Sequence, residues 1–532
     1  MSGVVVNAAT QTHDDSRARQ PLFSARKRLF MASLLFAFLF PLVTWKQAAG
    51  CALLLLLFDA LILPWLDIDV SKRSGGAQGM GAATPGLPQP LPGPLLNEGG
   101  GTPIPAGHPY AASPAPWRTG VILYPISVLA LVVLYRKYLH IAAAAWAIMA
   151  LGDGMASVVG EWRYKIAATL PSSQQVTWPQ SWRCKIAAPS WWRGKLAATL
   201  PWNREKTWAG SLSFVVAGTV GAYLLTRWIA PDIPPQKTLI VCTAAALLGA
   251  VTESLPIALD DNITVPLVTS AFMFCAFLVE RSALDSNLPY LGRRLLLAIA
   301  VNLGFALLAG ALKAASRSGA VCGFLLGTAI YLGYGYKSFL LLFAFVLLGS
   351  FATRLGFAKK SARGVAERRG GARSWREALA NLLAAAFFAL LVITTHHEAA
   401  FLIALVAALG EAAGDTVSSE IGQWASDRAY LITTFKLVPA GENGGISLAG
   451  TAAGFAASAI IMGLGLGLGL CGPYKFAGPA IALGAAAAGN LFDSFLGATI
   501  QRRGLVTNGM VNFAGTSVAG ALALGLALHL GL

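Results

Sequence analysis

Residues 398–423 read EAAFLIALVAALGEAAGDTVSSEIGQ, a mostly apolar stretch whose second half carries three acidic residues. Its length suits a membrane span, which needs about 20 predominantly apolar residues. Carboxylates at the end of a span are costly unless they pair, bind a cation or line a wet cavity. Glu411, Asp415 and Glu420 therefore indicate a functional site at the end of a transmembrane helix.

Three further stretches place acidic or amide side chains beside long apolar runs in the same way. They are GDGMASVVGE at 152–161, TESLPIALDDN at 252–262 and GNLFDSFLGATIQ at 489–501. Two of the four clusters fall in each half of the chain. The sequence therefore predicts a membrane protein with two polar sites.

The 532-residue chain is 56% hydrophobic and 12% charged, with a mean hydropathy of +0.62. These values are too apolar for a soluble protein of this size. We expect an all-α, polytopic integral membrane protein with roughly 15 transmembrane helices in two bundles. The apolar stretches begin near residues 29, 47, 119, 139, 209, 238, 262, 294, 318, 338, 377, 398, 447, 477 and 509.

The formal net charge of +16 does not indicate a nucleic-acid partner, because the basic residues gather in loops between the apolar stretches. They lie before residue 29, between 163 and 206, and between 359 and 376. Basic loops stay on the cytoplasmic side of a membrane. Alternating the spans from an inside N-terminus puts the acidic clusters near the cytoplasmic face and residues 396–398 on the opposite face.

The predicted organisation has a short N-terminal segment and two membrane domains. Residues 1–28 are a basic cytoplasmic N-terminus, 29–285 the first domain and 290–532 the second, with the loop 281–293 as the boundary between halves. Within the first domain, 74–116 is a Gly/Pro-rich linker. Residues 162–208 form a loop with three copies of a W-R-x-K-[IL]-A-A repeat.

The first candidate site combines carboxylates with a helix start that carries a lysine. KTWAGS at 206–211 opens an apolar stretch, and a helix N-terminus with lysine, hydroxyl groups and glycine suits a phosphate. The adjacent acids of TESLPIALDDN suit Mg²⁺, which takes oxygen ligands and shares them with substrate phosphates. The expected phosphate ligands are Lys206, Thr207, Gly210, Ser211 and Asn262. The expected metal ligands are Asp153, Asp260 and Asp261.

The second candidate site lies in the C-terminal half. Glu411 and Asp415 are one helical turn apart, so their charges repel unless a cation lies between them. GENGGIS at 441–447 is a Gly-rich helix start suited to an anion. The expected metal ligands are Glu411, Asp415 and Asp493. The expected nucleotide or phosphate ligands are Arg373, Asn381, Asn443, Gly444, Ser447, Gln501, Asn508 and Asn512.

The motifs of both halves resemble known kinase families. GDGMASVVGE, PWNREKTWAGS and TESLPIALDDNITVP resemble the CTP-dependent polyprenol kinases, which include phytol and dolichol kinases. Residues 290–532 resemble the phytyl-phosphate kinase family, long catalogued as a membrane domain of unknown function. The motifs that carry this second resemblance are GDTVSSEIGQ, GENGGISLAGT, FDSFLGATIQ and TNGMVNF.

These resemblances imply that the first half phosphorylates a prenyl alcohol held in the lipid and that the second half phosphorylates its monophosphate. The donor would be CTP or another nucleoside triphosphate, and Mg²⁺ is expected because phosphoryl transfer is chiefly positioning and charge neutralisation. The product would be a diphosphate, such as phytyl diphosphate, for tocopherol or prenylquinone synthesis. The expected location is a bacterial inner membrane, or a plastid membrane in a eukaryote. The residues expected to carry catalysis are Asp153, Glu253, Asp261, Asp415, Glu420 and Asp493.

Two other functions stay open at this point. A secondary transporter would also carry intramembrane acids and glycine-interrupted helices. Against it, the two halves are expected to carry different motifs and to place their acids near one face. A cytidylyltransferase that forms a CDP-lipid would use similar nucleotide and Mg²⁺ chemistry.

Overall fold

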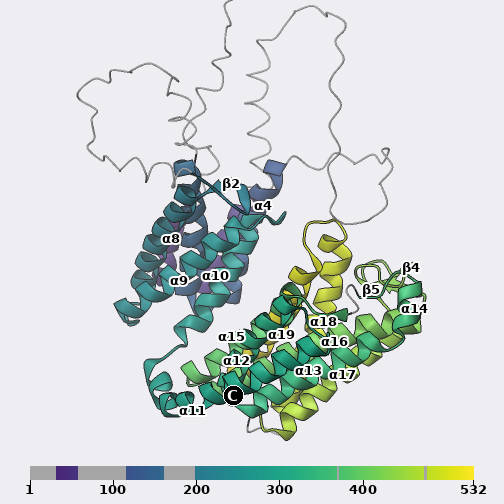
Figure 1. Cartoon of the computed structure of the whole chain (residues 1–532). Coiled ribbons are helices and arrows are strands. Elements are labelled where there is room, and N and C mark those ends of the chain that lie inside the picture. Colours follow the sequence, from purple (N-terminus) through teal and green to yellow (C-terminus); the bar gives the residue numbers. More distant parts are fainter. Residues whose placement is uncertain (1–30, 58–115, 161–197, 368–370, 473–475) are drawn as a thin grey trace, which may run out of the picture. The chain divides into compact units, whose positions relative to one another are not determined.

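The computed structural model describes residues 31–57, 116–160, 198–367, 371–472 and 476–532. The chain forms two compact units, whose helices Figure 1 shows. Unit 1 comprises Met1–Pro256 and Asp260–Phe274, and unit 2 comprises Ile257–Leu259 and Cys275–Leu532. The predicted basic N-terminus, residues 74–115 of the linker and residues 161–197 of the repeat loop lie outside the described residues.

Unit 1 is a helical bundle with one small hairpin. The helix α5 runs without a break into the π-helix η5, and the antiparallel strands β1 and β2 lead directly into α8. Its elements are η2 Leu34–Leu42, α2 Trp45–Leu57, α4 Pro116–Leu134, α5 Leu139–Ala147, η5 Ile148–Asp153, β1 Thr199–Leu200, β2 Asn203–Thr207, α8 Trp208–Ile229, α9 Pro235–Ser254 and α10 Asp261–Phe277.

Unit 2 is a larger bundle with a three-stranded antiparallel sheet of order β4-β3-β5. Its helices before the sheet are α11 Arg281–Ala311, α12 Arg317–Tyr334, α13 Tyr336–Arg354, α14 Phe357–Ala362, α15 Trp375–Thr394 and α16 Glu398–Ala425. The sheet consists of β3 Arg428–Leu431, β4 Leu437–Pro439 and β5 Gly445–Ile446. The elements after it are α17 Leu448–Gly467, α18 Ala477–Leu496, the π-helix η8 Gly497–Gln501 and α19 Asn508–His529.

The helix α16 is the core of unit 2. It packs against α13, α15, α17, α18 and α19, and Figure 1 shows α13, α16 and α17 side by side. Small residues allow this close packing, as is common between membrane helices. A Cβ atom on Gly450 of α17 would lie 2.6 Å from the carbonyl oxygen of Ser418, and one on Gly454 would lie 2.7 Å from that of Gly414.

The predicted all-α, polytopic membrane fold is confirmed. A helix begins at or near fourteen of the fifteen positions where an apolar stretch was expected to start, and the remaining position, residue 294, lies inside α11. Within the described part of the chain, ten helices are long and apolar enough to cross a membrane. Four apolar helices there are shorter, with 10–17 residues each.

The prediction of a loop at residues 281–293 was wrong, because these residues form the first turns of α11. Contacts with the end of α15 hold this polar segment in place. Asn287 Nδ2 donates to the carbonyl oxygen of Ile393 at 3.2 Å, and Ser282 Oγ lies 2.9 Å from His396 Nε2. Polar residues at a helix start were mistaken for a connection between the halves.

Candidate functional site

A buried group of acidic side chains lies at the centre of unit 2. Glu411 and Asp415 lie one turn apart on α16, and Asp493 comes from α18. Glu411 is 1% exposed, and among the described residues neither of its carboxylate oxygens has a hydrogen-bond partner. Asp493 Oδ2 is likewise buried without such a partner in the described part of the chain. Because a buried, unpaired carboxylate is costly, this group requires a proton, a cation or a ligand.

Two glycines make the space in which Glu411 lies. A side chain on Gly515 of α19 would collide with Glu411 Oε1, and its Cβ atom would lie 3.3 Å from that of Asp493. A Cβ atom on Gly489 of α18 would lie 2.8 Å from Cγ of Glu411. The helices α16, α18 and α19 can therefore converge on the acidic group only because both positions carry glycine.

Amide and guanidinium groups surround the acidic group. Asn512 Nδ2 of α19 donates to Asp415 Oδ2 at 3.1 Å and to Asn381 Oδ1 of α15 at 3.4 Å. Arg373, just before α15, interacts with the charge of Asp415, and its Nη1 lies 3.4 Å from Glu367 Oε1. Four predicted site residues, Asn512, Asp415, Asn381 and Arg373, thus meet in one place.

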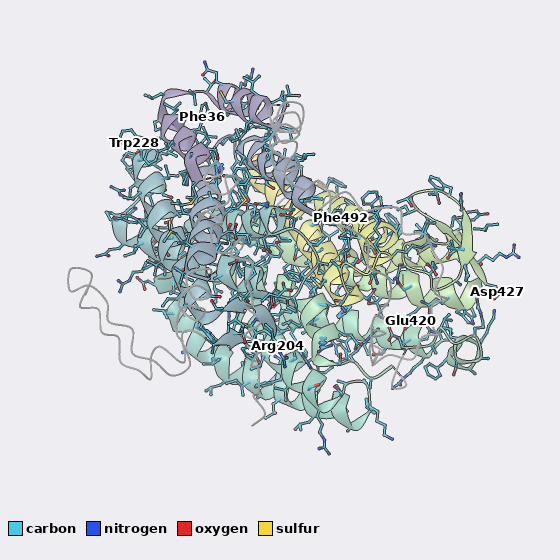
Figure 2. The ribbon with its side chains drawn as sticks, turned by 90° about the horizontal axis from the view of Figure 1, so that it is seen from above. Phe36, Arg204, Trp228, Glu420, Asp427 and Phe492 are labelled. Carbon is cyan, nitrogen blue, oxygen red and sulfur yellow. The ribbon has the colours of Figure 1, made fainter. Side chains whose placement is uncertain are left out.

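Glu420 belongs to a separate group in which every carboxylate oxygen is paired. Its Oε2 accepts a hydrogen bond from Lys360 Nζ at 2.5 Å, and its Oε1 accepts one from the Thr353 hydroxyl at 2.7 Å. Lys360 is fully buried and also donates to the backbone oxygens of Ala352 and Thr353. This pairing favours a positioning role for Glu420, labelled in Figure 2, over the predicted catalytic role.

The same group reaches the acidic centre through one further contact. Arg373 Nη2 donates to the Thr353 hydroxyl at 3.4 Å, so the Lys360–Glu420 pair helps to orient Arg373. Lys360 and Thr353 were not among the predicted site residues. Lys360 counted only as part of a basic loop, and the sequence gives no local signal that it pairs with an acid 60 residues away.

The Gly-rich turn before α17 packs against the end of α18. Ser447 Oγ accepts a hydrogen bond from a backbone N–H of the first turn of α17 at 3.1 Å. Gly444 has φ 74°, and a side chain there would collide with Ala498. Across the next connection, Gln501 Nε2 donates to Asn508 Oδ1 at 3.2 Å. The predicted phosphate ligands Gly444 and Gln501 both lie near Gly497 at this corner, and Asn443, Ser447 and Asn508 belong to the segments that form it.

Lys206 is the centre of the candidate site in unit 1. Its Nζ lies 2.6 Å from Glu253 Oε1 and 3.3 Å from Asp261 Oδ2, and Asp153 at the end of η5 interacts with its charge. Burial alone would lower the pKa of Lys206, but the charges of Glu253 and Asp261 outweigh burial and raise the pKa above its ordinary value. Three predicted catalytic acids therefore surround a lysine that stays protonated.

The other predicted residues of unit 1 hold its backbone. Thr207 Oγ1 accepts the N–H of Gly210 at 3.0 Å and caps α8, whose first turn includes Ser211. Asp260 Oδ1 accepts the backbone and side-chain N–H groups of Asn262 at 2.9 and 2.7 Å. Asp260, a predicted metal ligand, thus has one oxygen engaged in the turn that starts α10.

The two sites differ in how well they fit a metal ion. Within the described residues, no group of three or more His, Cys, Asp or Glu side chains is arranged to hold a metal. Mg²⁺, however, usually takes one or two carboxylates and completes its shell with water and substrate phosphates. The unpartnered oxygens of Glu411 and Asp493 fit that requirement. In unit 1, Lys206 already pairs with Glu253 and Asp261.

The two units share sequence patterns, which contradicts the expectation that their motifs differ. G-D-x-x-x-S-x-x-G occurs at 152–160 and again at 414–422, followed each time by an acid or its amide and then by tryptophan. [ST]-x-A-G follows at 207–210 and at 447–450. Both patterns appear in the same order, so they constitute an internal repeat that the sequence analysis overlooked.

The repeated patterns have the same structural role in both units. Thr207 caps α8 and Ser447 caps α17. The following glycine lies against the helix that carries the G-D pattern, since a Cβ atom on Gly210 would lie 3.3 Å from the Ala156 carbonyl oxygen. In unit 1 the π-helix η5 ends at Asp153, and in unit 2 the π-helix η8 follows α18, which carries Asp493; such segments are frequent at functional sites.

Comparisons with known proteins place relatives in unit 2. Residues 300–526 match the family described as integral membrane protein DUF92. The chloroplast protein VTE6 of Arabidopsis thaliana is 36% identical over 216 residues, which cover 39% of this chain and 64% of that protein. An uncharacterized membrane protein of Synechocystis is 34% identical over 204 residues, covering 38% of this chain and 78% of that protein. An uncharacterized membrane protein of Methanocaldococcus jannaschii is 33% identical over 232 residues, which cover 43% of this chain and 92% of that protein.

No solved structure matches this chain. The chain spans less than two thirds of VTE6 but most of the Synechocystis and Methanocaldococcus proteins. The family match leaves the residues before 300 unassigned. Through residues 300–526, this chain belongs to the DUF92 family of integral membrane proteins.

Proposed function

We propose that unit 2 is a prenyl-phosphate kinase that converts a prenyl monophosphate into its diphosphate. The observation that carries the proposal is that both carboxylate oxygens of Glu411 and Oδ2 of Asp493 are buried without a hydrogen-bond partner among the described residues, beside Asp415 and Arg373. Mg²⁺ would balance the charge of Glu411 and Asp493, and a substrate phosphate that contacts Arg373 would complete the shell of the metal. The motif resemblance to phytyl-phosphate kinases supports the choice of an isoprenoid substrate.

The proposed reaction joins two phosphates. An oxygen of the prenyl monophosphate attacks the γ-phosphorus of CTP or another nucleoside triphosphate. The bond between the γ-phosphorus and its bridging oxygen breaks, and the nucleoside diphosphate leaves. Mg²⁺ held by Glu411 and Asp493 would neutralise the phosphate charge. Arg373 binds the monophosphate, and Asn512 fixes the orientation of Asp415 by donating to its Oδ2.

Unit 1 is proposed as the kinase for the preceding step, the phosphorylation of the free prenyl alcohol. The specific support is the group formed by Lys206, Glu253 and Asp261, together with the resemblance of its motifs to polyprenol kinases. Lys206 would bind the transferred phosphate, as cations commonly do in phosphoryl transfer. The hydroxyl proton of the prenol would pass to one of the neighbouring carboxylates.

The test uses membranes that contain the full chain, with labelled phytol or labelled phytyl monophosphate and with CTP, ATP, GTP or UTP. Chromatography of the products should show monophosphate from phytol and diphosphate from either substrate. Diphosphate from the monophosphate but none from phytol would retain the unit 2 activity and overturn that of unit 1. A CDP-linked product would identify a cytidylyltransferase. Nucleotide-independent transport by purified protein in liposomes, without phosphorylated products, would identify a transporter.

A further inference from the structure

A cavity in unit 2 lies among α11, α12, α13, α15 and α16. It has a volume of about 110 Å³ and is partly open, so a long ligand would extend out through its opening. Its walls are mainly apolar, with Phe305 on α11, Phe324 on α12 and Phe345 on α13. The cavity is therefore suited to an apolar ligand.

One end of this cavity is polar and adjoins the acidic centre. Arg373, Asn381 and Thr416 line it. Asn381 Oδ1 accepts from Asn512 Nδ2, which also donates to Asp415. A single side chain, Asn512, therefore connects this end of the cavity to Asp415 of the proposed transfer site. An anionic group bound at this end would lie next to that site.

The cavity extends away from the polar end along two helices. Gly319 on α12 lies against the carbonyl oxygen of Arg373, and Gly323, one turn further on, also lines the cavity. On α13, a Cβ atom on Gly349 would lie 3.3 Å from Thr416, and Phe345 lines the cavity one turn away. One turn of helix advances about 5.4 Å, so the apolar walls begin about that far from the anion-binding end.

We propose that this cavity binds the isoprenoid chain of the prenyl monophosphate, with its phosphate at Arg373. That the ligand is an isoprenoid rests on the proposed function. That the ligand combines an apolar chain with an anionic group rests on the lining of the cavity. Gly323 keeps the passage open, because nothing lies within 4 Å of the Cβ atom that another residue would place there. Gly323 thus determines whether substrates longer than one isoprene unit can bind.

The experiment compares Gly323→Leu with Gly304→Leu in purified full-length protein in nanodiscs. Gly304 on α11 also has nothing within 4 Å of its Cβ position, but it does not line the cavity. With C20 monophosphate, Gly323→Leu should lower kcat/KM about tenfold or more, because displacing two methylene groups from an apolar site already accounts for that factor. With C5 monophosphate, whose chain ends near the first turn, it should change less than about twofold. Gly304→Leu should leave both values unchanged.

The C5 substrate reports whether the variant is folded. If Gly323→Leu does not fold, Ala306→Leu on the opposite wall of the cavity provides the same test. Equal losses for C20 and C5, or no loss for C20, in a folded variant would overturn the proposal.

Binding without nucleotide separates this proposal from the proposed function. If the wild type phosphorylates neither substrate, the kinase assignment fails. Binding of labelled C20 monophosphate that Gly323→Leu abolishes and Gly304→Leu retains would still support the cavity, and equal binding by all three proteins would overturn it. Displacement of C20 monophosphate by equimolar phosphatidate would also overturn it, by identifying a phospholipid as the occupant.

Discussion

Unit 1 and unit 2 use the same sequence patterns to assemble acidic sites, but they balance the negative charge differently. In unit 1, Lys206 lies between Glu253 and Asp261. In unit 2, the buried lysine Lys360 pairs with Glu420 instead, and Glu411 keeps both carboxylate oxygens without a partner among the described residues. In unit 2, Arg373 interacts with the charge of Asp415, but Glu411 is left for a cation that arrives with the ligands.

The largest expected effect separates the two sites. Asp415→Asn should lower diphosphate formation on the order of 100-fold and leave monophosphate formation intact, because only the group around Glu411 is changed. Asp153→Asn should do the reverse and spare the use of added prenyl monophosphate. Product chromatography measures both steps, with Asp427→Asn as the control because Asp427, labelled in Figure 2, is 79% exposed. Loss of both steps from either change would mean one composite site.

The second prediction concerns the buried ion pair of unit 2. Lys360→Met should destabilise the protein by about 3–5 kcal/mol, because it leaves Glu420 buried without its cation. Thermal unfolding of the detergent-solubilised protein would measure the loss. Lys359→Met is the matched control, since Lys359 donates to a backbone oxygen at an exposed position. Equal stability of both variants would show that the Lys360–Glu420 pair does not support unit 2.

The third prediction concerns the cation that unit 2 is expected to need. Mg²⁺ at 100 times its dissociation constant should stabilise the wild type by about 2.7 kcal/mol. Glu411→Gln should remove this stabilisation, whereas Glu253→Gln should preserve it, because Glu253 already pairs with Lys206. Unfolding curves recorded with and without Mg²⁺ provide the measurement. Removal by Glu253→Gln alone would reverse the assignment of the metal to unit 2.

The smallest expected effect tests the shared helix caps. Thr207→Ala and Ser447→Ala should each cost about 1 kcal/mol, the usual effect of losing one N-cap hydrogen bond. If the cap also contacts a phosphate, the KM for nucleotide should rise for the step of that unit alone. Unfolding and kinetics on the same samples distinguish the two roles. Unchanged stability in both variants would contradict the shared capping role.

The helical fold could be predicted from the sequence because each membrane helix corresponds to a long apolar stretch. The sequence also located Asp415, Asn512 and Arg373, since polar residues at such positions are rare enough to stand out. The same reasoning failed at Arg281, where polar residues begin a helix instead of forming a loop. Local composition does not distinguish a polar helix start from a connection.

The partners within the site could not be predicted, because they depend on distant packing. Nothing near Glu420 in the sequence indicates that Lys360 lies against it, while Glu411 finds no such partner among the described residues. Gly515 leaves room for Glu411 where three helices meet, and the sequence of a single helix does not reveal this contact. The internal repeat, by contrast, was available in the sequence at residues 152–160 and 414–422.

The burial of α16 has a consequence for biosynthesis. In its most apolar 18-residue window, 94% of the helix is buried inside the protein, although α17, α18 and α19 are made only afterwards. Until they arrive, Glu411 lacks the neighbours that α18 and α19 provide at Gly489 and Gly515, and carboxylates insert poorly into a membrane. A nascent chain interrupted after Ala425 should therefore be retained by the insertion machinery or degraded. Completion of the last three helices is therefore the step that buries the acidic centre of unit 2.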